Sequence, residues 1–250
     1  MELDRLYHFA LLAQFAFAAI TFFSLLFITA PYGRFGRLGW GPSVKALYGW
    51  IIMETPAVAM IFLWFITSNY NLVSIVMIVI WQSHYLRRSY HYPFTMKGRN
   101  KPFPIMLVVF AIIFNCMNGF VNGYHVFHMR SFDVEWLRSW QFIGGVFLFY
   151  TGYTINVQSD NILSKLKRGG DGSYVIPFGG MFRYVSSPHY LGEIIEWIGW
   201  ALLTWSWAGL AFAVYTIANL APRALSHHKW YRDNFPDYPS QRKALVPFVW

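Results

Sequence analysis

Charged residues are scarce in this sequence, and apolar residues are abundant. Asp, Glu, Lys and Arg together make up 12% of the chain, whereas ordinary globular domains carry about 25%. Apolar residues make up 56%, and the mean hydropathy is +0.35. Several windows are apolar over nearly the ~20 residues that a helix needs to cross a bilayer. This balance argues against a soluble domain, and we predict a multi-span membrane protein.

Cysteine occurs once, and several motifs of catalysis or ligand binding are missing. Cys116 excludes an intramolecular disulfide, and we interpret it as a core thiol in an apolar run. No H-x-x-x-H, H-E-x-x-H or cysteine cluster occurs, so we expect no metal site. There is no G-x-S-x-G serine elbow. The glycines around Gly169 and Gly179 do not form G-x-G-x-x-G, so no Rossmann fold is expected.

Long basic runs are also missing, although the net charge is +9. We therefore expect no nucleic-acid partner and interpret the charge as loop charge facing a membrane surface. Membrane lipid is then a partner, together with a lipophilic substrate, and we expect a monomer.

Seven apolar segments predict about seven transmembrane helices and an all-α integral membrane protein. The first lacks a basic n-region and is too long for a signal peptide, so we interpret it as a membrane helix. The predicted spans are Tyr7–Ala30, Val44–Thr67, Leu72 to Tyr85 or beyond, Pro104–Tyr124, Trp140–Asn156, Tyr190–Trp205 and Trp207–Leu225.

The distribution of basic residues supports seven spans. With alternating loops, 17 of the 20 Lys and Arg residues fall on one face, in residues 31–45, 86–104, 157–189 and 221–250. Only Arg5, Arg130 and Arg138 fall on the other. The positive-inside rule then places the C-terminus in the cytoplasm and the N-terminus outside or in the lumen. The membrane would be the bacterial inner membrane or the endoplasmic reticulum, depending on the source.

The longest polar interval runs from Asn156 to Trp197 and contains the long cytoplasmic loop between the fifth and sixth spans. Its glycines and Pro177 favour turns over helix. Polar backbone between membrane segments must lie in water at the bilayer surface or line a cavity. A connection of this length more often has a function than serves only to join two helices.

Two residues of the N-terminal half are candidates for chemistry. Glu54 lies in the middle of the second span, where a carboxyl group should face the bundle interior and have a partner. The alternative is a protonated structural carboxyl. Tyr85, near the end of the third span, is either a hydrogen-bond donor in a site or an interface anchor.

In the C-terminal half, Glu193 and Glu196 are spaced i, i+3 and share a helical face. Basic loop residues either bind phosphate groups or only set the topology; the four considered are Lys97, Arg99, Lys167 and Arg223.

The polar interval and the C-terminal region carry a series of motifs that come in the order of a known family. They are SDNIL, SYVIPFGGMFRYVS, LGEIIEWIGWAL, TWS, LAFA, RAL, HHKWY, DYP and RKALVPF. Upstream lie ETPA at Glu54–Ala57, HYLRRSY at His84–Tyr90 and NGYHVF at Asn122–Phe127. From Asn156 onward the chain closely resembles the steroid 5α-reductases, and the resemblance covers most of the chain beyond the first span.

This resemblance implies an oxidoreductase that uses NADPH to reduce the Δ4 double bond of 3-oxo-Δ4-steroids to 5α-3-oxosteroids. Glu54 and Tyr85 match the pair that binds the keto oxygen, where donors stabilise the charge that develops during hydride transfer. Glu54 would have to be protonated, which desolvation favours. Met53, beside Glu54, matches a substrate-binding position.

The resemblance also implies the cofactor site. The matching positions are Tyr92, Lys97, Arg99, Asn156, Asp160, Lys167, Tyr174, His189, Glu193, Arg223, His227 and Tyr231. Nearly all lie on the face that the charge count assigns to the cytoplasm, where NADPH is available. We expect one reductase domain over residues 1–250, with substrate-side helices in about 1–125 and the cofactor half in about 140–250.

The sequence departs from the family pattern at several of these positions. Met53 replaces a Gln, which removes one polar contact to the steroid, and Lys167 replaces an Arg and loses bidentate geometry. Met96-Lys97 replaces an Asn-Arg pair. Ser187-Pro188-His189 replaces a Gly-Ala-Asn and resembles the H-P-x-Y-x-G signature of sterol reductases and isoprenylcysteine methyltransferases. Alternatives are therefore a reductase of another lipophilic enone or a polyprenyl or enoyl lipid, and a lipid methyltransferase that uses S-adenosylmethionine.

Overall fold

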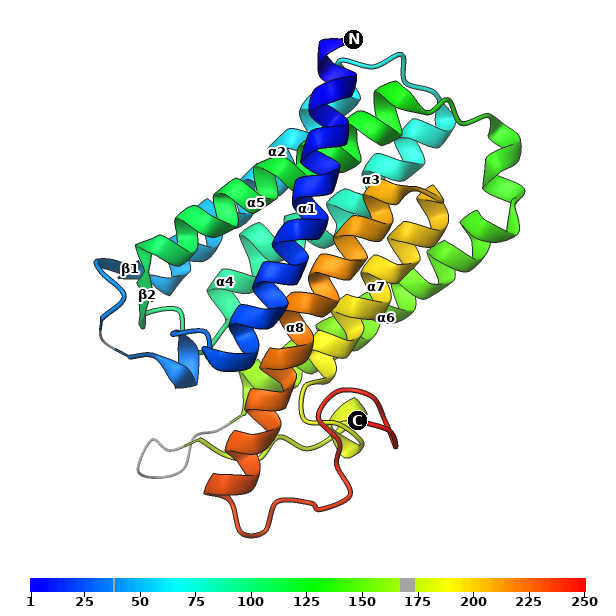
Figure 1. Ribbon diagram of the computed structural model, residues 1–250. Coiled ribbons are helices and arrows are strands. Elements are labelled where there is room, and N and C mark those ends of the chain that lie inside the picture. The colour runs from blue at the N-terminus through cyan, green and yellow to red at the C-terminus, as the bar shows by residue number, and fades with distance from the viewer. Residues whose placement is uncertain (38, 167–173) are drawn as a thin grey trace.

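The computed structural model describes residues 1–37, 39–166 and 174–250. In these residues the protein is a bundle of long helices with one short β-ribbon (Figure 1). The predicted all-α class is confirmed in this coarse form. The predicted cofactor residue Lys167 and the Gly-rich centre of the polar interval lie outside the described residues.

The N-terminal half contains four long helices. They are α1 (Glu2–Phe27), α2 (Ala46–Ile66), α3 (Leu72–Leu86) and α5 (Ile105–Tyr124). A π-helical stretch (Arg87–His91) and the short α4 (Tyr92–Thr95) continue α3, and a second π-helical stretch (His125–Met129) continues α5. The strands β1 (Ser43–Lys45) and β2 (Pro102–Pro104) pair antiparallel, with Ser43 opposite Pro104, and so tie the start of α2 to the start of α5.

The C-terminal half contains three long helices. They are α6 (Trp140–Lys165), α7 (Pro188–Thr204) and α8 (Trp207–Asn234). Short 3₁₀ turns cover Gly33–Phe35, Val134–Arg138 and Gly180–Arg183. Helix α6 packs along α7, α7 along α8, α8 along α1, and α2 along α5. The N-terminus lies at one end of the bundle and the C-terminal tail at the other (Figure 1).

Each predicted span contains a long helix, but two helices run further than hydropathy indicates. The fifth span was expected to end at Asn156, whereas α6 continues to Lys165. The seventh was expected to end near Leu225, whereas α8 continues to Asn234. The extension of α6 carries Ser159 and Asp160, which are 1% and 6% exposed. Both side chains have protein partners, so this polar segment remains helical inside the bundle.

Within the described residues, four helices are long and apolar enough to cross a bilayer, namely Glu2–Phe27, Ala46–Ile66, Ile105–Met129 and Trp207–Asn234. Large apolar side chains point outward from α1, including Phe9 at 71% and Leu12 at 70% exposure. A soluble monomer rarely exposes so much apolar surface, which supports a lipid-facing exterior. Helices α3 and α7 have 15 and 17 residues, fewer than the ~20 that a perpendicular crossing requires.

The core is aromatic and lies where α3, α7 and α8 meet. Trp81, Trp197 and Trp200 are at most 1% exposed. Their rings contact one another and Phe212, with the centroids of Trp81 and Trp200 4.9 Å apart and those of Trp197 and Phe212 4.2 Å apart. Aromatic pairs of this kind contribute about 0.5–1.5 kcal/mol each beyond their buried area. This cluster holds α3 against α7 and α8 of the C-terminal half.

Candidate active site

Glu54 lies in α2 and faces the bundle, as its sequence context predicts. Its carboxyl is 14% exposed, and Oε1 lies 3.9 Å from Nε of Arg88. Nδ2 of Asn115 in α5 donates to Oε2 at 3.4 Å, and more closely to the carbonyl of Met53 at 2.7 Å. Neither contact to the carboxyl is short, so both oxygens keep the capacity to bind a further group.

Tyr85 lies at the level of Glu54 on the neighbouring helix. Helices α2 and α3 are joined by a short turn, and Nε1 of Trp81 donates to the carbonyl of Ala57 at 3.1 Å. Tyr85 lies one helical turn after Trp81 in α3, and Glu54 lies about one turn before Ala57 in α2. Because the two helices run antiparallel, both residues lie on the same side of the Trp81–Ala57 bond. Tyr85 is 4% exposed, and its hydroxyl has no hydrogen bond to any residue that the structure describes. A buried phenol without a protein acceptor is available to a substrate.

Arg88 connects Glu54 to the C-terminal half. Its Nη2 lies 3.8 Å from Oε2 of Glu193 in α7. The guanidinium carbon lies 4.5 Å from the ring centroid of Trp50 and 4.7 Å from that of Tyr92. These cation–π contacts hold a largely desolvated arginine in place between the two carboxyl groups.

Arg87 makes a second bridge, to α6. Its Nη2 donates to Oδ2 of Asp160 at 3.0 Å, and its Nη1 to Oδ1 of Asn156 at 3.3 Å. Nδ2 of Asn156 in turn donates to the carbonyl of His189 at 3.0 Å and to Oε2 of Glu193 at 3.5 Å. Both arginines stand in the π-helical stretch after α3. The wider π turn shifts the register after Tyr85, and such insertions are frequent at functional sites.

The structure thus brings together a large part of the predicted site. The connected members are Glu54, Arg87, Arg88, Asn156, Asp160, Glu193 and the backbone of His189, with Tyr92 stacked on Arg88; we call this set the central network. Sequence reasoning missed three of its contacting groups, Arg87, Arg88 and Asn115. A pair of arginines directly after an apolar span must find partners, which was a usable indication.

A second group of predicted residues lies at the start of α7 and in the C-terminal part of α8. The ring of His227 stacks on Phe35 at 5.3 Å and lies 6.3 Å from His189. Nη2 of Arg223 donates to the hydroxyl of Tyr190 at 2.8 Å. Arg223 and His227 line one small cleft together with Tyr32 and Phe35.

Tyr174 and Tyr231 are joined to this region by cations that the sequence did not single out. Nη2 of Arg34 donates to the hydroxyl of Tyr231 at 2.9 Å, and its guanidinium lies 5.1 Å from the ring of Tyr174. Nζ of Lys101 donates to the hydroxyl of Tyr174 at 2.9 Å. Cations and aromatic rings from both halves therefore meet at this end.

Three predicted residues stand apart from these groups. Lys97 and Arg99 are exposed, and Nη1 of Arg99 donates to the carbonyl of Phe94 at 2.9 Å. Met53 is 6% exposed and packs with Trp50 and Phe103, toward β2. None of the three side chains has a described hydrogen bond or ion pair to the central network, and that of Met53 meets it only through the apolar cluster against which Tyr92 packs.

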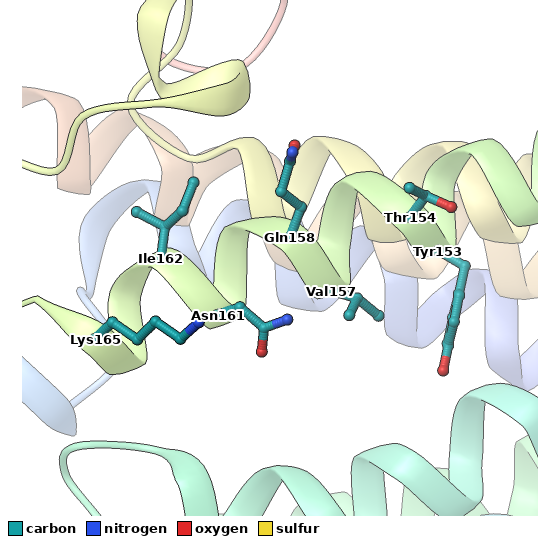
Figure 2. A pocket seen from close by; sticks show the side chains of 7 residues that line it. All are labelled: Tyr153, Thr154, Val157, Gln158, Asn161, Ile162 and Lys165. Carbon is teal, nitrogen blue, oxygen red and sulfur yellow. The ribbon is translucent and has the colours of Figure 1, made fainter.

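An open hollow lies on α6 away from this chemistry (Figure 2). Its lining residues are Tyr153, Thr154, Val157, Gln158, Asn161, Ile162 and Lys165 (Figure 2). All of its lining residues belong to α6, and none belongs to the central network. The central network is a better candidate because it combines charge, burial and contributions from four helices.

Comparison with known proteins identifies the family. Residues 101–250 match the family profile described as 3-oxo-5-alpha-steroid 4-dehydrogenase. The chain is 41% identical over 255 residues to a steroid 5-alpha-reductase DET2 of Gossypium hirsutum, covering 99% of this chain and 98% of that protein. It is 35% identical over 255 residues to a 3-oxo-5-alpha-steroid 4-dehydrogenase 1 of Rattus norvegicus, covering 100% and 98%. The chain belongs to the steroid 5α-reductase family.

Within the family, plant and animal proteins are both similar to this chain. A 3-oxo-5-alpha-steroid 4-dehydrogenase 2 of Sus scrofa is 43% identical over 174 residues, covering 70% of this chain and 68% of that protein. Family membership confirms the resemblance that the motifs indicated, and with it the prediction of an oxidoreductase that acts on CH–CH groups.

Proposed function

We propose that this protein reduces the Δ4 double bond of 3-oxo-Δ4-steroids to 5α-3-oxosteroids, with NADPH as the reductant. The observation that carries the proposal is the placement of Glu54 and Tyr85 at one level on α2 and α3, with the Tyr85 hydroxyl not hydrogen-bonded to any described residue. Arg88 joins Glu54 to Glu193 of α7, in the half proposed to hold the cofactor. The names of the relatives supply the steroid class, and the arrangement of side chains supports the roles.

The pair would act on the keto oxygen of the substrate. When bound, NADPH would supply the hydride for the β-carbon of the enone, and a proton added to the α-carbon would complete the saturated ketone. As negative charge develops on the oxygen, Tyr85 and a protonated Glu54 each donate a hydrogen bond to it. Removing one such donor typically lowers kcat by about 10²–10³-fold. Asn115 orients the Glu54 carboxyl from the opposite side.

The cytoplasmic ends of α7 and α8 have the chemistry to hold a nucleotide. Several polar atoms are buried there without a partner among the described residues, namely Nη1 of Arg34, Oγ of Ser187 and Nδ1 of His189. Buried polar groups ordinarily have partners, so such atoms suit a polar ligand. Arg34 and Arg223 would face phosphate groups, and Tyr174 and Tyr231 would stack on the bases. Asn156, Asp160 and Glu193 would fix the nicotinamide end beneath Glu54.

We also propose seven crossings, with the C-terminus in the cytoplasm. An odd number of crossings agrees with termini at opposite ends of the bundle (Figure 1). The segment between α4 and β2 and the end of α8 with its tail lie toward the end away from the N-terminus (Figure 1). They contain eight of the 20 Lys and Arg residues, namely Lys97, Arg99, Lys101, Arg223, Lys229, Arg232, Arg242 and Lys243. Helix α3 would cross with help from its π-helical extension, in which Arg87 and Arg88 are 13% exposed and paired with carboxyl groups of other helices.

The test uses purified protein with NADPH and a 3-oxo-Δ4-steroid, with the product identified by mass spectrometry. We expect the saturated 5α ketone. Glu54→Gln and Tyr85→Phe should each lower kcat by about 10²-fold or more, whereas the rise in melting temperature on adding NADPH should stay within about 2 °C of the unmodified protein. No turnover across a panel of steroid enones would defeat the proposal.

Two matched controls separate the site from general damage. Tyr90→Phe removes a hydroxyl one or two turns after Tyr85, where it donates to Oγ1 of Thr55 at 3.3 Å. Glu135→Gln neutralises an exposed carboxylate that pairs with Arg138. Both should keep kcat within about two-fold, because surface changes are usually within ±0.5 kcal/mol. If Tyr85→Phe and Tyr90→Phe behave alike, the role assigned to Tyr85 is wrong.

A reductase of another lipophilic enone is the second candidate. Met53 is the observation that favours it, because its side chain packs toward β2 and offers no hydrogen bond beside Glu54. Comparing kcat/KM for steroid, polyprenyl and fatty enones decides between the two.

A further inference from the structure

A buried histidine–carboxyl pair joins α3 to α7 beside the candidate site. Nδ1 of His84 lies 2.9 Å from Oε1 of Glu196. The two residues are 3% and 0% exposed, and Oε2 of Glu196 has no partner among the described residues. Burying such a pair is costly, and apolar replacements of similar volume are often as stable or more so. Stability alone therefore does not account for it.

Each member of the pair is adjacent in sequence to an aromatic residue, and these two aromatic residues touch. Tyr85 follows His84, and Trp197 follows Glu196. The ring centroids of Tyr85 and Trp197 are 5.5 Å apart, and those of His84 and Trp197 are 4.8 Å apart. His84 meets Tyr85 edge to face at 4.9 Å. His84-Tyr85 of α3 and Glu196-Trp197 of α7 therefore contact each other both through the hydrogen bond and through their aromatic rings.

The phenol ring of Tyr85 is thereby confined on three sides. Trp81 stacks on it at 5.0 Å, and Trp197 and His84 contact it from α7 and from its own helix. Only the hydroxyl end is left without a described protein contact. The hydrogen bond between His84 and Glu196 joins α3 to α7 beside these rings, and so holds the rings of His84 and Trp197 against Tyr85.

The α7 side of the bond cannot yield easily. A Cβ added at Gly152 in α6 would lie 2.4 Å from the backbone nitrogen of Glu196. The two backbones are therefore in direct contact at this residue. Because the backbone of Glu196 packs directly on α6, its side chain has a fixed position. The hydrogen bond then fixes the position of His84, three residues before the π-helical stretch.

We propose that the hydrogen bond between His84 and Glu196 positions Tyr85 for catalysis, by locking its ring between Trp81 and Trp197. The inference rests on the role proposed for Tyr85. A donor displaced by about 1 Å can lose 10²-fold in rate, so a directional bond beside a catalytic phenol has a function that apolar packing lacks. Glu196 and His84 act through Tyr85 and are positioning residues.

The first experiment compares two replacements of one residue. Glu196→Leu removes the hydrogen bond and keeps an apolar side chain, whereas Glu196→Gln keeps a group that bonds to Nδ1. We expect Glu196→Leu to lower kcat by about 10–100-fold, with little change in the NADPH-induced rise in melting temperature. Glu196→Gln should restore kcat to within about three-fold of the unmodified enzyme, because a neutral hydrogen bond differs by only ~0.5–1.5 kcal/mol. A Glu196→Gln enzyme as impaired as Glu196→Leu would overturn the proposal, because the proton or charge of the carboxyl would then be what matters.

The second experiment asks whether the pair acts through Tyr85. In a Tyr85→Phe background, Glu196→Leu should lower kcat by less than about two-fold further, because the group that it positions is gone. Multiplicative loss in the double variant would overturn the proposal. Should Glu196→Leu fail to fold, His84→Phe, which keeps an aromatic ring and removes the bond, makes the same comparison. Unimpaired turnover by Tyr85→Phe alone would instead defeat the proposed function, so the two failures are distinguishable.

Gln14→Leu is the matched control. Gln14 is 0% exposed, and its Nε2 donates to Oδ1 of Asn118 at 2.9 Å, between α1 and α5. The Gln14→Leu variant loses a hydrogen bond that is as deeply buried as the one between His84 and Glu196, but neither Gln14 nor Asn118 has a described contact with Tyr85. Its melting temperature should fall while kcat stays within about two-fold. An equal loss of kcat in this variant would show that any weakened core impairs the enzyme, and would overturn the specific role of the pair.

Discussion

The contact between α6 and α7 is close enough that a single methyl group should disturb the cofactor half. At Gly192 an added Cβ would lie 2.5 Å from the backbone nitrogen of Asn156 and 2.6 Å from the carbonyl oxygen of Gly152. Non-bonded carbon contacts are most favourable at about 3.5–4.0 Å. Both clashing atoms are backbone atoms, which cannot rotate away, so the helices have to separate by roughly 1 Å in Gly192→Ala.

A separation of this size would break the hydrogen bonds of Asn156. Its Nδ2 bonds to the carbonyl of His189 at 3.0 Å and to Glu193 at 3.5 Å. Adding about 1 Å takes both beyond hydrogen-bond range. Overpacking of this kind typically costs about 1–3 kcal/mol of stability. We expect the dissociation constant for NADPH to rise by about 10-fold or more, because each lost bond is worth ~0.5–1.5 kcal/mol and the site also shifts.

Gly145→Ala provides a control with the same steric defect in another place. An added Cβ there would lie 2.4 Å from the backbone nitrogen of Leu203. Leu203 is about 16 Å along α7 from Gly192 at 1.5 Å per residue, and no predicted cofactor residue lies near it. Gly145→Ala should lose a similar amount of stability and keep the NADPH dissociation constant within about two-fold.

Isothermal titration with NADPH and thermal unfolding in the same detergent measure both quantities. If the two alanine variants lose stability equally but also lose equal NADPH affinity, the link between Asn156, His189 and the cofactor is refuted. If neither variant loses stability, α6 and α7 can separate without a cost in free energy, and the close backbone contact does not stabilise the packing of these two helices.

Two further predictions concern buried polar pairs, both measured by thermal unfolding in detergent. Asp160→Ala removes the carboxylate partner of Arg87, which is 13% exposed, and should lower the free energy of unfolding by about 3–5 kcal/mol. Part of this loss should be recovered in the Arg87→Met, Asp160→Ala double variant. No recovery would contradict the pairing. Asn122→Leu removes the acceptor of Nε1 of Trp200, 2.9 Å away, and should cost about 1–3 kcal/mol with kcat within about two-fold; unchanged stability would mean that the indole does not depend on this bond.

Hydropathy predicted the helices well and their ends poorly. Each of the seven apolar segments contains a long helix, because hydrophobic length directly reports what a helix can bury or expose to lipid. The ends of α6 and of the helix after Tyr85 depend on polar partners instead. Asp160 is tolerated in a helix because Arg87 neutralises it from another element, and the sequence of one element does not reveal a partner on another.

The candidate site was predictable where burial alone demands a partner. Glu54 was expected to have one, and Arg88 and Asn115 contact it. The spacing of Asn115, Asn118 and Asn122 in an apolar segment, at i, i+3 and i+7, places three amides on one helical face and was an unused indication. The π-helical stretch after Tyr85 had no indication of its own, because its register shift arises from contacts with other helices.

The central network and the His84–Glu196 pair together explain why the two halves are interdependent. The donors His84, Arg87 and Arg88 project from α3 and its extension, whereas Asp160, Glu193 and Glu196 project from α6 and α7. Separated, each half would place unpaired ionisable groups in a low-dielectric interior, at a cost of several kcal/mol for each ion. The same juxtaposition puts the carboxyl and phenol of the substrate side directly against the residues proposed to hold the nicotinamide. Pairing charge across the halves therefore stabilises the bundle and, with the roles proposed above, would bring the two reactants to one place.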